Sequence, residues 1–201
     1  KVNISPLFFT FDNKNLYVSS NRDRDKSAIF EFDLNNVKES KLIFEHDEVD
    51  ASGLIYSRKR KVLTGVSYTV AKTNMKFFDP WRENLQNKLE SKLPGYEVGI
   101  TSFSKDEKKA VIVSYSDKSR GTYYYYDIET NELSDLGKVS PWLNEDHMAE
   151  MTPIKYKSRD GLTINGYLTL PRNTDGTNLP VVVNPHGGPW ARDTWGYRSE
   201  I

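Results

Sequence analysis

The chain has 201 residues, and its 28 lysines and arginines are balanced by 28 aspartates and glutamates. This balance gives no net charge to attract nucleic acid or an anionic membrane, so we expect neither as a partner. The chain has no cysteine, which excludes disulfides, thiol catalysis and cysteine-ligated zinc.

The N-terminal residues 1–6 contain neither an initiator methionine nor the apolar run of a signal peptide. We therefore expect the numbering to begin inside a longer precursor. No apolar stretch approaches the roughly 20 residues that span a bilayer. The sequence does not distinguish a cytoplasmic location from a periplasmic or secreted one.

The first two thirds of the chain repeat one layout: a β-rich run, a polar turn, a second β-rich run, a polar loop, and a third run that ends in aspartate. The closing aspartates are Asp33, Asp79 and Asp127, which lie 46 and 48 residues apart. The aromatic residues before the first turns, Phe11, Tyr56 and Phe103, give spacings of 45 and 47 residues.

A period of about 40–50 residues with several strands per unit is typical of β-propeller blades. A blade cannot bury its two apolar faces alone, so neighbouring blades must stack. We predict a mainly β fold with a partial β-propeller of about three blades; the alternative is an irregular β-sandwich with evenly spaced hairpins. Because three blades cannot close a ring, we expect further blades before Lys1 or self-association through open blade edges.

Within these repeats the leucine spacing predicts a short amphipathic helix over residues 81–93, inserted between the second and third blades. The alternation of Tyr123 to Tyr126 predicts side chains that pack on both faces of one strand. The basic run Arg58 to Lys61 occupies a hairpin turn and is interpreted as solvated. Neither the loop Asn21 to Asp25 nor His46 with its adjacent carboxylates forms a convincing metal site, so we expect no metal and no cofactor.

After residue 139 the pattern changes. Residues 140–151 are interpreted as a linker, and residues 152–201 begin with two alternating strands joined through Arg159, Asp160 and Gly161. The Asp-Gly pair indicates a hairpin turn, because glycine supplies the positive φ that such a turn needs. The apolar run Val181 to Val183 lacks alternation, which predicts a central strand covered on both faces. We expect this third part to be the first strands of an α/β-hydrolase domain, with residues 1–139 the C-terminal blades of the propeller.

The predicted central strand leads into His186-Gly187-Gly188-Pro189. A glycine turn at the end of such a strand exposes backbone N–H groups, which is how α/β-hydrolases build half of an oxyanion hole. No Gly-x-Ser-x-Gly sequence occurs in the chain, so we expect the nucleophile, acid and base to lie outside it.

The stretches 156–171 and 179–193, together with the preceding repeat, resemble the prolyl oligopeptidase-like serine peptidases, particularly the acylaminoacyl-peptidase and dipeptidyl-peptidase branches. The resemblance implies a peptide substrate, a Ser-Asp-His triad and a hydrolase domain capped by a propeller. It assigns the N–H of Gly188 to the oxyanion hole, with Gly187 supporting the turn. His186 precedes the region where the triad is expected, so a structural role is favoured over that of the base.

On this interpretation the 201-residue chain carries one oxyanion-hole element and no triad, and is expected to be inactive alone. One alternative is a propeller module that binds a partner without catalysis. A second is an esterase of the same hydrolase fold.

Overall fold

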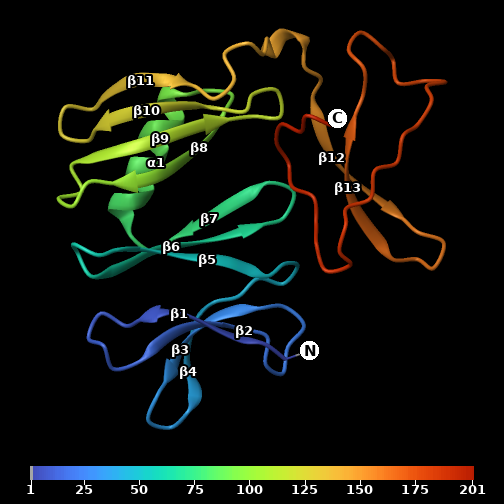
Figure 1. The fold of residues 1–201 in the computed structure, drawn as a ribbon. Helices are drawn as coiled ribbons and strands as arrows, with labels where there is room; N and C mark the ends of the chain where they lie inside the picture. The colour runs from blue at the N-terminus through green and yellow to red at the C-terminus, as the bar shows by residue number, and fades with distance from the viewer. Residues whose placement is uncertain (1) are drawn as a thin grey trace. The chain divides into compact units, whose positions relative to one another are not determined.

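A computed structural model describes residues 2–201 (Figure 1). In these residues the chain forms thirteen strands, one α-helix and one short 3₁₀-helix. The strands form four separate antiparallel sheets of four, three, four and two strands. The chain divides into two compact units, one up to Gln86 and one from Asn87, and the division falls inside the α-helix.

The first sheet lies in the N-terminal unit and has the strand order β1-β2-β3-β4. Its buried residues are Val18, Ala28 and Phe30, in contact with the partly buried Leu16 and Phe32. The fourth strand completes the first predicted blade. The strands are β1 (Ile4–Phe9), β2 (Leu16–Ser20), β3 (Ala28–Asp33) and β4 (Lys38–Phe44).

The second sheet has only three strands and packs on the first within the same unit. A buried cluster of Ile29, Ala51 and Val66 joins the two sheets, and the rings of Phe8 and Tyr56 lie 4.2 Å apart. This stacking is what a repeated unit with two apolar faces requires. The strands are β5 (Ala51–Ser57), β6 (Val62–Thr69) and β7 (Thr73–Phe77).

The predicted helix is confirmed as α1 (Pro80–Lys92), and it follows β7 at the point where the other two repeats place a fourth strand. Asp79 explains the change. Its carboxylate accepts the backbone N–H groups of Trp81 and Arg82, and Pro80 occupies the first helical position, where a missing N–H has no cost. In the other repeats, the carboxylates of Asp33 and Asp127 also accept backbone N–H groups, but those groups belong to a hairpin turn.

The third sheet, in the C-terminal unit, again has four strands in the order β11-β10-β9-β8. Ile112 is fully buried in it. The tyrosine run behaves differently from the prediction: Tyr126 is buried, but Tyr123 is 41% exposed. The strands are β8 (Glu97–Phe103), β9 (Lys109–Tyr115), β10 (Thr122–Asp127) and β11 (Glu132–Lys138).

One turn chemistry recurs in the first hairpins of the first and third repeats. The Thr10 hydroxyl donates to Asp12, 2.6 Å away, and the Asn15 N–H donates back to Thr10. Ser104 and Asp106 make the same contacts in the third repeat. The hydroxyl of Thr10 is the largest influence that holds the pKa of Asp12 below its usual value. Local side-chain bonds of this kind close a turn without tertiary contacts.

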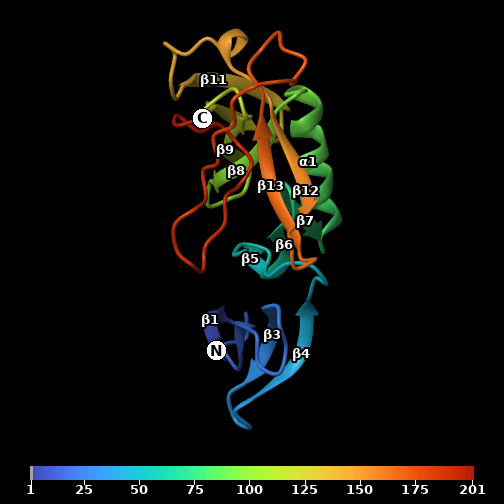
Figure 2. The same cartoon turned by 90° about the vertical axis from the view of Figure 1, so that its right-hand side faces the viewer.

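The chain beyond β11 contains the 3₁₀-helix η1 (Glu145–His147) and a hairpin of β12 (Met151–Lys157) and β13 (Thr163–Thr169). The two strands of the hairpin run side by side in Figure 2. The predicted turn through Asp160 and Gly161 is confirmed, with Gly161 at φ +84°. The boundaries expected after residues 139 and 151 stay a prediction. This mostly β architecture agrees with the fold class expected from the repeat.

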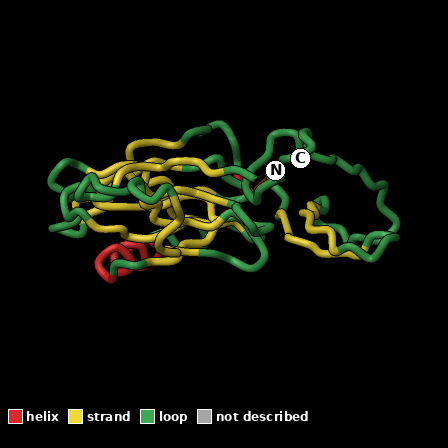
Figure 3. The backbone as a smooth tube through the Cα atoms, turned by 90° about the horizontal axis from the view of Figure 1, so that it is seen from below, coloured by secondary structure: helices red, strands yellow, loops and turns green. Residues whose placement is uncertain are grey.

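The expected central strand Val181 to Val183 does not form. These side chains are 82–91% exposed, and residues 170–201 contain no strand or helix (Figure 3). A central strand needs backbone partners on both edges and covered faces, and no strand among residues 2–201 pairs with this run. No helix in this described part of the chain is long and apolar enough to cross a membrane.

Candidate functional site

The predicted oxyanion turn is an exposed glycine turn whose conformation requires glycine at one position. Gly188 has φ +148°, in the region that L side chains rarely adopt. A Cβ at this position would lie 2.9 Å from the Trp190 nitrogen, whereas a Cβ at Gly187 would meet nothing within 4 Å. The turn is closed by the Ala191 N–H, which donates to the Pro189 carbonyl over 2.9 Å. Gly188, rather than Gly187, is therefore the residue that the geometry constrains.

The three histidines lie in different settings. The Nδ1 of His186 is 2.8 Å from the carbonyl oxygen of the adjacent Gly187, a local contact within the turn. The ring of His46 stacks on Tyr68 at 4.7 Å and accepts the Glu48 N–H. His147 lies in η1. In the part of the chain that the structure describes, no group of three or more metal-ligating side chains comes together.

Downstream of the turn, the chain is attached to two other elements. The indole Nε1–H of Trp195 donates to the Met151 carbonyl at the start of β12, over 2.8 Å. The Tyr197 N–H donates to the carbonyl of Ser116, in the loop between β9 and β10, over 3.0 Å. The residues after the glycine turn are therefore held by the β9–β10 loop and by the first strand of the hairpin.

The β9–β10 loop, residues 116–121, also contacts Glu150 and Met151. Its Asp117 carboxylate accepts the Met151 N–H at 2.7 Å, and the Lys118 ammonium pairs with Glu150 at 2.8 Å. The hydrogen bond from Lys118 lowers the pKa of Glu150, and the same bond raises the pKa of Lys118. This pair is solvent-exposed, so its contribution to stability is small.

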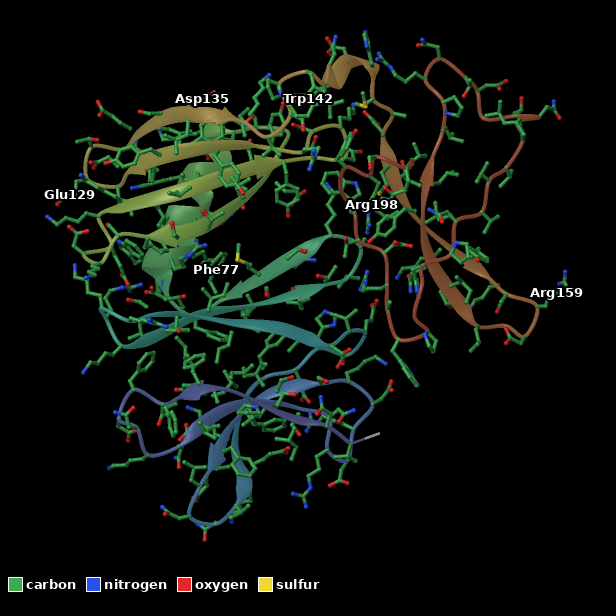
Figure 4. All side chains as sticks on the ribbon, viewed as in Figure 1. Phe77, Glu129, Asp135, Trp142, Arg159 and Arg198 are labelled. Atoms are coloured by element: carbon green, nitrogen blue, oxygen red, sulfur yellow. The ribbon has the colours of Figure 1, made fainter. Side chains whose placement is uncertain are left out.

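An open pocket of about 370 Å³ lies where this loop meets the downstream segment. Hydroxyl groups and two arginines line it, and Arg198 is labelled in Figure 4. The Arg198 guanidinium is already engaged by Asp193, at 3.5 Å. The other lining residues are Tyr115, Ser116, Ser119, Arg120, Thr194, Trp195, Gly196 and Tyr197.

Sequence reasoning did not single out Asp117, Met151 or Trp195. The loop around Asp117 has the composition of an ordinary polar turn, and its partner Met151 is 34 residues away. Trp195 lies 44 residues from Met151. The only available signal was a tryptophan close behind a glycine turn, which does not by itself indicate a partner.

A second attachment joins the residue before β8 to η1. The Tyr96 hydroxyl donates to the Glu145 carboxylate over 2.7 Å. This hydrogen bond, together with partial burial, raises the pKa of Tyr96 to about 12. The residues after β11 thus contact the third blade at both the Tyr96 side and the β9–β10 loop.

The chain is similar in sequence to dipeptidyl aminopeptidase BIII of Pseudoxanthomonas mexicana, with 32% identity over 200 residues. The match covers 96% of this chain and 29% of that protein. No family model matches the chain.

Solved structures with a similar fold include prolyl oligopeptidase B from Galerina marginata, with a TM-score of 0.53 and 14% identity. A second is one from a study of two prolyl endopeptidases, with a TM-score of 0.50 and 16% identity. The matches cover 82% and 86% of this chain and 24% of each of those chains. At these identities the structural likeness concerns the fold.

Proposed function

We propose that the chain forms part of a serine peptidase that hydrolyses short peptides through an acyl-enzyme, a proposal supported by its sequence similarity to a dipeptidyl aminopeptidase and by its fold similarity to prolyl oligopeptidases. Residues 1–139 would supply C-terminal propeller blades, and residues 152–201 the start of the α/β-hydrolase domain. The nucleophile, acid and base would be supplied from outside these 201 residues.

The role of this chain in the chemistry is stabilisation of negative charge. When a serine oxygen attacks a peptide carbonyl, its proton passes to histidine and the carbonyl oxygen becomes an oxyanion. Backbone N–H groups held at 2.7–3.1 Å from that oxygen stabilise it because they need no reorientation. The Gly188 N–H would be one such donor, and the single observation that carries the assignment is the glycine-only conformation of Gly188 within His186–Pro189.

The name of the sequence relative, dipeptidyl aminopeptidase BIII, supports dipeptide release as the substrate class. We assign the same class to the protein that contains this chain. Dipeptidyl p-nitroanilides with a free amino group should be cleaved, and the same compounds acetylated at that amine should not.

Paired glycine variants of the full-length protein test the oxyanion role. Gly188→Ala places a Cβ 2.9 Å from the Trp190 nitrogen and disfavours φ +148°, so the turn must shift and the N–H is misdirected. Gly187→Ala is the matched control because its Cβ meets open space. We expect kcat to fall by about 10²–10³ in the first variant, the typical loss for one oxyanion-hole donor, and by less than about tenfold in the second.

Melting temperature and KM are measured alongside, so that unfolding and loss of substrate binding are distinguished from loss of catalysis. A Gly188→Ala protein that is folded and retains the kcat of the unmodified protein would refute the role of Gly188. Hydrolysis of p-nitrophenyl esters without hydrolysis of any peptide substrate would refute the peptidase assignment in favour of an esterase.

A further inference from the structure

Three segments that are distant in the sequence meet at one point of the C-terminal unit. They are the β9–β10 loop, the first residue of β12 and the segment that follows the oxyanion turn. Five residues connect them through hydrogen bonds, and we call this set the anchor circuit: Ser116, Asp117, Met151, Trp195 and Tyr197.

The anchor circuit is closed. The Asp117 carboxylate accepts the Met151 N–H at 2.7 Å, and the Met151 carbonyl accepts the Trp195 indole N–H at 2.8 Å. Two residues later, the Tyr197 N–H returns to the carbonyl of Ser116, next to Asp117, at 3.0 Å. Ser116 is 7% exposed and Met151 is 9% exposed. Water therefore competes little for the bonds made at these two residues.

The oxyanion turn has no comparable attachment of its own. Among residues 171–191, the hydrogen bonds of the structure join neighbours in the sequence. Thr174 bonds to Pro171, Thr177 to Asp175, and Ala191 to Pro189. Downstream of Gly188, Trp195 and Tyr197 make long-range hydrogen bonds within the C-terminal unit. These bonds constrain the position of the turn from its downstream side.

We propose that Asp117 and Trp195 are positioning residues for the oxyanion turn, acting through the Met151 backbone, which both of them bind. This inference rests on the proposed role of Gly188. An oxyanion donor has to be placed to a fraction of an ångström, and a misplacement of about 1 Å can cost about a hundredfold in rate. The anchor circuit makes the β9–β10 loop of the third blade part of the support for the chemical step.

The first test is Trp195→Phe in the full-length protein, which keeps an aromatic ring but removes the indole N–H. Trp142→Phe is the matched control, because Trp142 is 74% exposed and lies in the linker after β11 (Figure 4). We expect kcat to fall about tenfold with Trp195→Phe, the cost of one well-made hydrogen bond, while KM stays within about twofold. Trp142→Phe should match the unmodified protein in both parameters.

A pair of inhibitors separates positioning from general damage. A peptide boronate forms a tetrahedral adduct whose oxygen occupies the oxyanion hole, whereas an aminoacyl pyrrolidide lacks the carbonyl at the cleaved position and does not use it. Trp195→Phe should weaken binding of the boronate by the same factor as kcat and leave binding of the pyrrolidide unchanged. Equal loss of both ligands would overturn the proposal, because a structural defect lowers both.

The second test uses Asp117, where two substitutions differ in one property. Asp117→Ala removes the acceptor for the Met151 N–H, whereas Asp117→Asn keeps an oxygen at that position. We expect Asp117→Ala to lower kcat and boronate affinity together, and Asp117→Asn to restore most of both. If the two variants behave alike, or if Asp117→Ala leaves kcat unchanged, the proposal fails. The two Asp117 variants also test the proposal if the Trp195→Phe protein does not fold.

Failure of the proposed function has a different signature. It appears as an unmodified protein without peptidase activity, or as a folded Gly188→Ala protein with full kcat. The anchor circuit is then still measured by amide hydrogen exchange, in which Trp195→Phe and Asp117→Ala should each speed exchange at Met151 or Tyr197. Unchanged exchange at both amides would show that the circuit does not hold this segment.

Discussion

Asp79 lies where the second repeat continues into helix α1 instead of a fourth strand. Its contribution to the stability of α1 can be divided experimentally into two parts. Its carboxylate caps α1 by accepting the N–H groups of Trp81 and Arg82, and it also pairs with Arg60 at 2.5 Å. The Arg60 guanidinium lies over the Trp81 ring at 4.5 Å. Two interactions with different chemistry therefore meet on one side chain.

The magnitudes follow from geometry and exposure. Loss of an N-cap costs about 1 kcal/mol. The side chains of the ion pair are 31% and 14% exposed for Arg60 and Asp79. The contribution of this ion pair to stability therefore lies between that of a surface pair, at most about 1 kcal/mol, and that of a charged hydrogen bond, about 1.5–3 kcal/mol. We expect the ion pair to contribute about 1–2 kcal/mol. Asp79→Asn, which still caps, should lose about 1–2 kcal/mol, and Asp79→Ala about 2–3 kcal/mol.

Hydrogen exchange of the α1 amides measures these losses locally, which matters because a protein of several units need not unfold in one step. Since 1.4 kcal/mol is a factor of ten, protection should fall about five- to thirtyfold in Asp79→Asn and about thirty- to 150-fold in Asp79→Ala. Asp135→Asn, on the exposed surface of β11, should leave exchange in α1 unchanged. Equal losses in the two Asp79 variants would refute the capping role, and no loss in either would refute both roles.

The pH dependence gives an independent check of the ion pair. The Arg60 hydrogen bond is the largest influence on the pKa of Asp79, which lies below its usual value of 3.8. The unfolded carboxyl thus takes up its proton at higher pH than the folded one. The stabilisation is complete above pH 3.8 and is lost as the pH falls through the lowered pKa. The advantage of the unmodified protein over Asp79→Asn, measured by urea denaturation, should shrink only in that acid range.

Two further predictions concern the third blade and its contact with the linker. Ile112→Ala should destabilise this blade by about 2–5 kcal/mol in urea denaturation, because Ile112 is fully buried. Leu136→Ala, at a position that is 60% exposed, should lower the free energy of unfolding by under about 0.5 kcal/mol. Equal losses in the two variants would show that Ile112 is not part of the core of this blade. Tyr96→Phe should abolish the tyrosine titration near pH 12 in ¹³C NMR and cost about 0.5 kcal/mol at neutral pH. Since the folded pKa is raised, the contribution of Tyr96 is complete below pH 10 and is lost as the pH rises through about 12, and a stability difference that grows in this range would contradict the assignment.

The sequence was informative wherever one short segment decides the structure. The turns built on Thr10 with Asp12, and on Ser104 with Asp106, close through side chains that reach backbone groups two to five residues away. The aromatic residues next to these turns, Phe11 and Phe103, were therefore reliable landmarks for the repeat. The helix α1 was predictable for the same reason, because its leucine spacing and its N-terminal Pro80 are local features.

The sequence was misleading at the run Val181 to Val183, which has the composition of a buried central strand and yet is exposed. A strand forms only where other strands accept its hydrogen bonds, and the run itself does not contain that information. The site shows the same division. The sequence predicted that Gly188 lies in a glycine turn, and the structure added the positive φ that makes glycine necessary there.

The anchor circuit was decided by tertiary structure alone. Asp117, Met151 and Trp195 are separated by 34 and 44 residues, and no pattern in any one of their segments identifies the other two. A turn forms from the stereochemistry of a few adjacent residues and therefore leaves a signature in the sequence. A hydrogen bond between distant segments depends on how the intervening chain folds, so its partners become recognisable only once that folding has brought them together.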